Sequence, residues 1–179
     1  ESLSLYFHRW LYVTKGIPSA SPEINLTEGI PFVTYSHLWK YNAQGVDLGT
    51  AWRATSYDDS SWPKGPGLLG FETATLPSPG IRTSVPDTDQ LTYYFRTTFA
   101  YSGRTTGATI SVDQILDDGA VYYLNGQEIG RSGMPTGTVT FTTVAGRTTG
   151  DAVEELAVIT TSGSALVQGT NVLAVEVHQ

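Results

Sequence analysis

Hydrophobic and polar residues alternate over most of this chain, and a period of two predicts β-strands. The pattern is clearest in residues 1–13, where one face of an extended segment would carry Leu3, Leu5, Phe7, Leu11 and Val13. Tyr6, Trp10 and Tyr12 would then lie on the opposite face. The chain therefore begins with a predicted strand that has one apolar face.

Short strands separated by turn residues continue to the end of the chain. They are expected at residues 32–40, 51–57, 92–101, 107–116, 120–124, 127–131, 138–145, 152–160 and 171–178. Residues 63–90 are rich in proline and glycine and predict a long loop. No segment repeats its apolar residues at the helical period. The spacing predicts an all-β fold of two packed antiparallel sheets, with these residues facing inward: Phe95, Phe99, Val121, Leu124, Leu173, Val175 and Val177.

The segment Leu116–Gly126, LDDGAVYYLNG, carries the strongest local signals. Residues 117–119, Asp-Asp-Gly, predict a tight turn, because short carboxylates bond nearby backbone amides and glycine tolerates a positive φ. Asn125-Gly126 predicts a type I′ turn, since both residues accept the left-handed conformation. Residues 120–131 are therefore expected to form a β-hairpin.

Three further stretches accompany this hairpin: residues 57–62 (YDDSSW), 91–99 (LTYYFRTTF) and 169–179 (GTNVLAVEVHQ). Together the four motifs resemble the galactose-binding-like jelly-roll module, which occurs beside glycoside hydrolase catalytic domains and in large secreted bacterial proteins. The resemblance covers about residues 32–179 and implies a jelly-roll β-sandwich. It implies little about function, because one fold hosts many.

The N-terminal strand is expected to be separate from this sandwich. Residues 14–29 contain two prolines and two glycines and predict a flexible linker arm between residues 1–13 and a domain at 30–179. In modules of the resembling family a sequence like AVEVHQ usually precedes one more strand, so a groove beside Asn171–His178 is expected to take residues 1–13. The strand could fill the groove of its own domain or of a neighbouring copy, which would join copies head to tail. A third alternative is an ordinary first strand.

Composition narrows the classes of partner. The net charge of −7 disfavours duplex nucleic acid, whose readers need a basic face. The absence of cysteine excludes disulfides and thiolate metal sites. No apolar run approaches the length of a membrane span. Charged residues make up only 15% of the chain, and abundant Thr, Ser, Gly and Tyr favour an extracellular or cell-surface location.

Two acidic pairs, Asp58-Asp59 and Asp117-Asp118, stand in predicted turns. Adjacent carboxylates of a strand point to opposite faces, so neither pair suits acid–base catalysis, and turn chemistry is the simpler interpretation. The alternative is a structural Ca²⁺ site, since Ca²⁺ takes oxygen ligands from loops and modules of the resembling family often carry calcium. No other cofactor is expected.

No catalytic residues are predicted. His8, His37 and His178 lie far apart and have no partner at metal-binding spacing. The sequence has neither a GxSxG motif nor a phosphate-binding glycine loop. The chain is therefore not expected to be an enzyme.

The aromatic residues leave two interpretations open. Trp39, Trp52 and Trp62 lie in or beside predicted strands and fit a core, but tryptophans also stack on sugar rings. The exposed face of the terminal strand, with Tyr6, Trp10 and Tyr12, could contact a polysaccharide or a protein, and so could Trp39. Asn25, in the arm, begins an N-glycosylation acceptor pattern.

Two functions follow from these observations. The first is a non-catalytic extracellular subunit that assembles into a filament or surface layer by donating residues 1–13. The alternative is a carbohydrate-binding module accessory to a polysaccharide-degrading enzyme.

Overall fold

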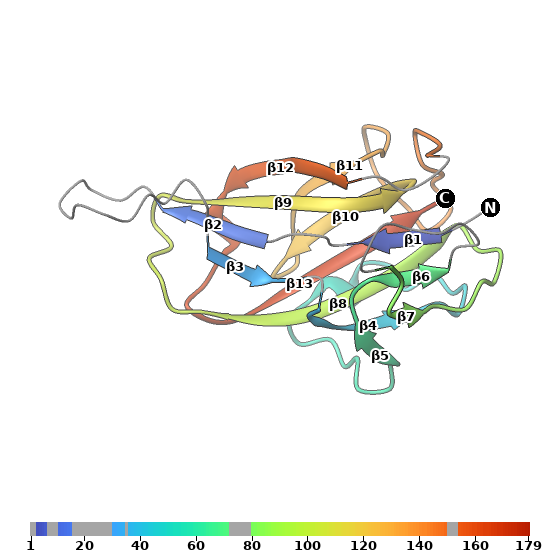
Figure 1. The fold of residues 1–179 in the computed structure, drawn as a ribbon, viewed down its shortest axis with the longest axis horizontal. Helices are drawn as coiled ribbons and strands as arrows, with labels where there is room; N and C mark the ends of the chain where they lie inside the picture. The colour runs from blue at the N-terminus through green and yellow to red at the C-terminus, as the bar shows by residue number, and fades with distance from the viewer. Residues whose placement is uncertain (1–2, 7–10, 16–29, 35, 72–79, 150–153) are drawn as a thin grey trace.

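The computed structural model describes residues 3–6, 11–15, 30–34, 36–71, 80–149 and 154–179, with the backbone alone at residues 3–6, 11–15, 30, 154, 157 and 158. Within these residues thirteen strands form two sheets that pack face to face (Figure 1). Helical structure in the same residues is limited to two single 3-10 turns, η1 (Ala51–Arg53) and η2 (Gly163–Ala165). None of it is long and apolar enough to cross a membrane. The predicted all-β sandwich is confirmed.

Sheet A has the order β3 (Ile30–Val33), β2 (Leu11–Lys15), β9 (Ala108–Asp117), β1 (Leu3–Tyr6), β6 (Leu69–Phe71) and β7 (Thr83–Ser84), and β12 (Glu154–Ser162) also pairs with β9. Sheet B has the order β11 (Gln127–Ser132), β10 (Gly119–Leu124), β13 (Gly169–His178), β8 (Thr92–Tyr101), β4 (Leu38–Asn42) and β5 (Lys64–Pro66). Neighbouring strands are antiparallel except β6 and β7, which are parallel.

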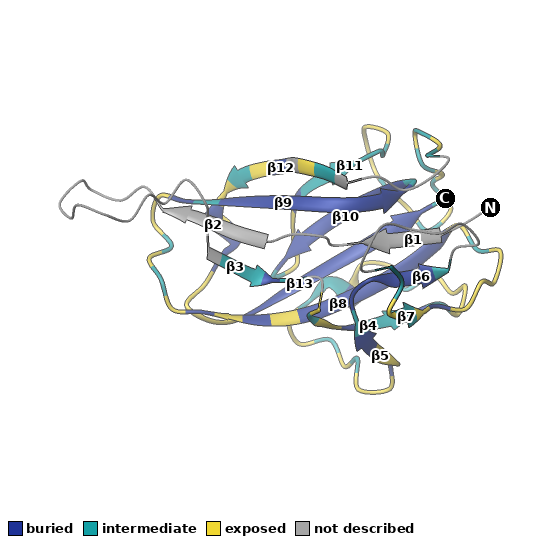
Figure 2. Cartoon of the chain, viewed as in Figure 1, coloured by how far each residue is buried: buried dark blue, intermediate teal, exposed yellow. Residues whose placement is uncertain are grey.

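The main core lies between the two sheets, where alternate residues of the long strands meet. Figure 2 shows β8, β9, β10 and β13 buried over most of their length. Their inward residues include Phe95, Phe99, Ile110, Val112, Tyr122, Leu124, Leu173, Val175 and Val177. Val121 is buried but belongs to a different cluster, so its predicted inward orientation was wrong. Leu124 and Val121 are three positions apart, and on a regular strand such residues face opposite sides.

The outer face of sheet B carries a second hydrophobic cluster under two loops. Trp52 and Trp62, from the loop between β4 and β5, pack on Tyr94, Val121, Tyr123 and Ala174. Met134, Val139 and Phe141, from the loop after β11, pack against the same cluster. Both faces of sheet B are therefore apolar, which explains why its strands do not show a simple alternation of buried and exposed residues.

Two of the predicted strands are parts of these covering loops. Residues 51–57 form η1 and a turn instead, because the carbonyls of Trp52 and Ala54 accept hydrogen bonds from Arg96 and not from a neighbouring strand. Residues 138–145 are also not a strand. There the hydroxyl of Thr143 accepts the N–H of Thr140 at 2.9 Å, and such local bonds compete with sheet pairing.

Two other boundaries also differ from the prediction. Residues 32–40 divide into β3 of sheet A and β4 of sheet B, with a turn in which the N–H of His37 donates to the carbonyl of Thr34 at 2.9 Å. The proline- and glycine-rich segment 63–90 contains the short strands β5, β6 and β7. The chain changes sheets at these points, and hydrophobic periodicity does not report such a change.

The N-terminal strands are central in sheet A of their own chain. β1 lies between β9 and β6, with Ser4 opposite Asp117 and Gly70. β2 lies between β9 and β3, with Val13 opposite Ile110 and Ile30. Pairing on both edges agrees with the expectation that this segment enters a sheet. The predicted position beside Asn171–His178 was wrong, because β13 is paired with β10 on one edge and β8 on the other. In the single chain β1 and β2 pair with β9, β6 and β3 instead.

The predicted hairpin is confirmed. Asn125 and Gly126 have φ values of 51° and 86°, and β10 pairs with β11 across this turn. The preceding residues 117–119 do not open the hairpin as a tight turn. They connect β9 of sheet A with β10 of sheet B, and so form a corner between the two sheets.

Candidate functional site

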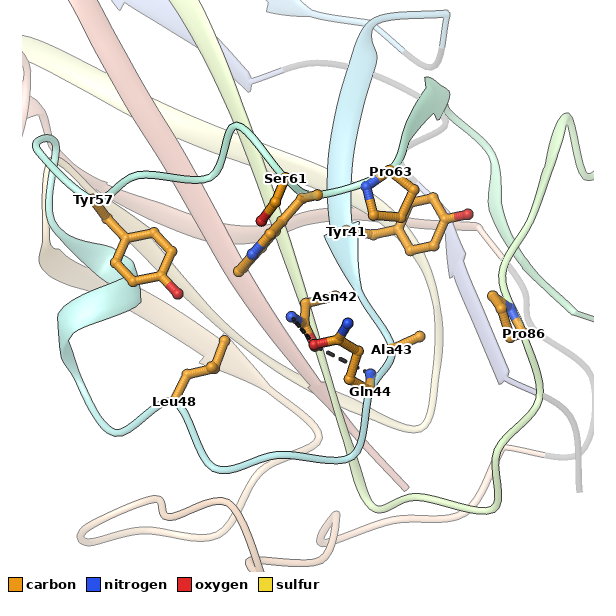
Figure 3. Close-up of a pocket in the computed structure, with 10 residues that line it drawn as sticks. Tyr41, Asn42, Ala43, Gln44, Leu48, Tyr57, Ser61, Pro63 and Pro86 are labelled. Carbon is orange, nitrogen blue, oxygen red and sulfur yellow. Dashed lines mark hydrogen bonds between the residues drawn. The ribbon is translucent and has the colours of Figure 1, made fainter.

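A pocket of about 320 Å³ lies where β4 ends and the following loop folds back over sheet B (Figure 3). It is lined by Tyr41, Asn42, Ala43, Gln44, Leu48, Tyr57, Ser61, Trp62, Pro63 and Pro86. The volume is at the lower end of the range for small-molecule sites. We call this the aromatic pocket.

Local hydrogen bonds fix the loop that forms the pocket. The side-chain oxygen of Asn42 accepts the N–H of Gln44 at 3.1 Å, and the carboxylate of Asp58 accepts the N–H of Ser60 at 3.0 Å. Both are turns in which a short side chain replaces a backbone acceptor. Hydrogen bonds from the side chain and backbone of Ser60 lower the pKa of Asp58. The turn therefore holds its geometry at neutral pH.

Aromatic rings form the inner wall of the pocket. The ring centroids of Tyr57 and Trp62 lie 5.8 Å apart at an interplanar angle of 67°. Trp62 is only 8% exposed, whereas Tyr57 is half-buried. In Figure 3 Tyr57 and Leu48 stand on one side of the pocket, Tyr41 and Pro63 on the other. Such edge-to-face pairs hold their rings rigidly and present apolar surface to a ligand.

Polar groups complete the pocket. The side-chain amide of Asn42 donates to Oε1 of Gln44 at 3.4 Å, which leaves Nε2 of Gln44 without a partner among the described residues. The hydroxyls of Tyr57 and Ser61 also bond no described residue. None of the lining residues is an acid, a histidine, a lysine or an arginine. The pocket therefore suits a neutral ligand with hydroxyl groups and an apolar face.

A second pocket of about 220 Å³ lies beside the first, and its lining is charged. Lys40, Asp59, Lys64 and Arg96 line it together with Leu38, Trp39, Thr97 and Thr98. The two oxygens of Asp59 accept Lys40 Nζ at 2.5 Å and Arg96 Nε at 2.7 Å. Burial opposes the charge on Asp59, but the hydrogen bonds from Arg96 and Lys40 outweigh it and lower the pKa of this carboxyl. We call this the basic pocket.

Arg96 connects the two pockets. It is 3% exposed, and its guanidinium donates to the carbonyls of Trp52 and Ala54 in addition to Asp59. Its Cζ lies 5.4 Å from the ring centroid of Tyr57, within cation–π range. Residues 59–64 contribute to both linings. The two pockets therefore adjoin through this segment, although no single residue lines both.

Besides the two pockets, a cluster of buried polar side chains lies beneath the loops that cover sheet B. Its residues do not line either pocket. Glu176 is buried, and its Oε1 accepts the hydroxyl of Tyr123 at 2.5 Å and Nη2 of Arg53 at 3.3 Å. Burial and the nearby Glu176 carboxylate raise the pKa of Tyr123, so the phenol remains a donor. His178 is also buried, with Nδ1 2.7 Å from the carbonyl of Thr143. These residues hold the second hydrophobic cluster in place.

The acidic pairs have structural partners. Asp58 bonds the loop backbone and Asp59 forms the ion pairs described above. Oδ1 of Asp118 accepts the N–H of Thr149 at 2.5 Å, so the predicted bond to a backbone amide exists, although it joins a distant loop and caps no turn. Asp117 is buried at the end of β9. No group of three or more acidic or histidine side chains suited to a metal occurs among the described residues.

The three tryptophans considered as sugar-stacking residues lie in different environments. Trp39 is fully buried in the main core, and Trp52 is fully buried in the second cluster. Trp62 lines the aromatic pocket. His37 bonds the carbonyl of Thr98 through Nε2 at 2.9 Å.

For the other predicted site residues the structure describes either nothing or the backbone alone. Phe7, Trp10 and Asn25 are outside the described residues, as is His8. For the remaining N-terminal candidates only the backbone is described, in β1 and β2: Leu3, Leu5, Tyr6, Leu11, Tyr12 and Val13.

Sequence reasoning did not identify Tyr41, Asn42, Gln44 or Tyr57 as site residues. Asn42 and Gln44 follow a predicted strand, and the spacing of an asparagine two residues before the amide it bonds is a recognisable turn signal. It marks the turn but not the pocket, because the aromatic wall of Tyr57 and Trp62 comes from residues 13 or more positions after Gln44.

No family model matches the chain, and no curated protein matches it. Among solved structures, a calcium-binding mutant of β-glucuronidase 2 from Bacteroides uniformis has a TM-score of 0.49 at 16% identity and covers 80% of this chain. A glycosyl hydrolase family 2 member from Bacteroides cellulosilyticus has a TM-score of 0.45 at 18% identity over the same share. The chain spans only 14% and 17% of those two structures, respectively.

Proposed function

We propose that this chain is a non-catalytic carbohydrate-binding module that holds one neutral sugar ring in the aromatic pocket. The observation that carries the proposal is the pairing of a rigid Tyr57–Trp62 wall with the free amide of Gln44 in a cavity of about 320 Å³. A pyranose has an apolar face that packs on aromatic rings and hydroxyls that bond amides. The uncharged lining favours such a ligand over a phosphate or an ammonium compound.

The lining also argues against catalysis in this pocket. Hydrolysis of a glycosidic bond generally needs two carboxyl groups that flank the bond, and no residue of the aromatic pocket carries one. Ser61 has no histidine or carboxylate beside it in the lining. The pocket is therefore a binding site, and the module would act as an extracellular accessory to a polysaccharide-degrading enzyme.

The test is binding to a panel of neutral polysaccharides, measured by affinity gel electrophoresis and by quenching of tryptophan fluorescence. The wild-type chain should bind at least one polymer. Gln44→Ala and Tyr57→Ala should weaken that binding at least tenfold, and Thr170→Ala, an exposed site on β13, should not. Circular dichroism melting curves establish that the variants are folded.

Two results would contradict the proposal. One is the absence of binding to every polymer of the panel. The other is binding that persists unchanged in both pocket variants, because the ligand would then occupy a different surface.

A further inference from the structure

Three cations stand in one row across three neighbouring strands of sheet B. Lys40 of β4 is directly opposite Lys64 of β5 on one side and Arg96 of β8 on the other. Directly opposed residues on neighbouring strands point to the same face, with Cβ atoms about 5 Å apart. The row therefore gathers three of the ten Lys and Arg residues of a chain with a net charge of −7.

The row is only partly neutralised. Asp59 bonds Lys40 and Arg96, whereas Lys64 is exposed and forms no ion pair with a described residue. Among the residues that line the basic pocket, three cations stand against one carboxylate; the exposed Asp58 carboxylate also interacts with Lys40 but lies outside the lining. Like charges directly opposite each other destabilise a sheet, so an anion bound here would remove a cost that the free protein carries.

The donors for such an anion are available. Arg96 is already committed to Asp59, Trp52 and Ala54, so it contributes charge and positions Asp59 without contacting a ligand. Lys40 is 35% exposed and has two further N–H groups beyond its bond to Asp59. Together with the whole ammonium of Lys64, these groups face a cavity of about 220 Å³, large enough for a carboxylate or a sulfate group.

The neighbouring pocket indicates what carries the anion. Lys40 and Asn42 lie on the same face of β4, about 7 Å apart at the usual rise per residue, and they line the basic and the aromatic pockets respectively. Neighbouring units of one polysaccharide chain can span a separation of this size. A nucleic acid or an anionic membrane would need a broader basic surface, which this acidic chain does not have.

We propose that Lys40 and Lys64 bind the carboxylate or sulfate of a sugar unit next to the ring held in the aromatic pocket, so that the ligand is an acidic polysaccharide. This inference rests on the proposed function. A uronate carboxylate and a sulfate ester share the chemistry that the two ammonium groups recognise. Polymers of the two kinds distinguish them.

The experiment compares affinities for carboxylated polymers that keep neutral units between the acidic ones (hyaluronan, partially methyl-esterified polygalacturonate), sulfated polymers of the same kind (κ-carrageenan) and neutral ones (dextran, galactan) at 150 mM salt. Fully methyl-esterified polygalacturonate has the same backbone with the charge removed. The wild-type chain should prefer carboxylated or sulfated polymers at least tenfold over neutral ones. Lys64→Gln should abolish the preference and leave affinity for neutral polymers unchanged. Arg104→Gln, which removes an exposed charge three residues after the end of β8, should have no effect.

The outcomes separate the two proposals. Binding of neutral polymers through Gln44 without a Lys64-dependent preference for acidic ones would overturn the acidic-polysaccharide inference and leave the proposed function intact. Binding of no polymer at all would overturn both. An acidic preference that persists in Lys64→Gln would overturn the assignment to the basic pocket.

Discussion

Asn125 donates a side-chain hydrogen bond of 2.8 Å to Oδ1 of Asn171, and through it the turn of the β10–β11 hairpin is joined to the start of β13. Asn171 is fully buried and makes three other bonds, to the N–H and carbonyl of Val167 and to the carbonyl of Gly169. The two sequence motifs LDDGAVYYLNG and GTNVLAVEVHQ therefore meet at this pair of amides. The two motifs occur together because the fold needs this contact between Asn125 and Asn171, and not because they form a ligand site.

Replacing Asn171 by alanine should lower the free energy of unfolding by about 2–4 kcal/mol, because each lost hydrogen bond contributes about 1 kcal/mol and buried backbone groups are left unpaired. Urea unfolding followed by circular dichroism measures the loss. Thr170→Ala, at the exposed neighbour, should stay within about 0.5 kcal/mol of wild type. Equal stability of the two variants would mean that the amide pair has no structural role.

Asp59→Asn should destabilise the protein at pH 7 by about 1–3 kcal/mol, because the buried guanidinium of Arg96 loses its carboxylate. The folded-state pKa of Asp59 lies below the ordinary value of 3.8. Its contribution is therefore complete above that value and disappears as the pH falls through the folded-state pKa.

The difference in stability between wild type and Asp59→Asn should thus be constant from pH 5 to pH 7 and shrink below about pH 4. Urea titrations at each pH measure it. Asp87→Asn is the control, since Asp87 is exposed and forms no ion pair with a described residue. A difference that grows on acidification would contradict the assigned direction of the pKa shift.

Much of the fold could be predicted from local signals. The Asn125-Gly126 turn and the long apolar strands near β8, β9 and β13 were expected close to their observed bounds, because each depends on nearby residues. The misassigned strands at 51–57 and 138–145 carry strand-like residues, but they cover sheet B as loops. Their apolar residues serve a second cluster, and nothing in a single sequence distinguishes burial in a loop from burial in a strand.

The candidate site was less predictable, since both pockets arise from pairing between distant segments. Lys40, Lys64 and Arg96 are separated by 24 and 32 residues in the sequence. Only the register of β4 with β5 and β8 brings them into one row. Trp62 was a candidate because it is aromatic. Its partner Tyr57 and the amide of Gln44 become candidates only when the loop between β4 and β5 brings them to the same pocket.

Tyr123→Phe should lower the free energy of unfolding by about 1.5–3 kcal/mol, because it removes a hydrogen bond to the buried carboxylate of Glu176 while keeping the ring. Arg53 Cζ lies 4.1 Å from the ring centroid of Tyr123, and this contact should persist. Tyr41→Phe is the matched control, since its hydroxyl bonds no described residue, and its stability should match wild type. Comparable losses in both variants would indicate that the phenylalanine substitution, and not the lost bond, is responsible.

Removal of residues 1–15 should abolish cooperative unfolding. β1 and β2 occupy the edge of β9 opposite β12, and without them β3 loses the strand to which it is paired while β6 keeps only the two-residue β7. Sheet A would be reduced in its described part to the β9–β12 pair, and the core side chains of β9 would lie at an open edge.

Urea denaturation measures the result: the truncated chain should give a broad transition with a reduced m-value, which reflects the smaller surface exposed on unfolding. A chain that lacks only residues 1–2, which precede β1, should unfold like wild type. A sharp transition with the wild-type m-value in the chain lacking residues 1–15 would show that the N-terminal strands are dispensable for the sandwich.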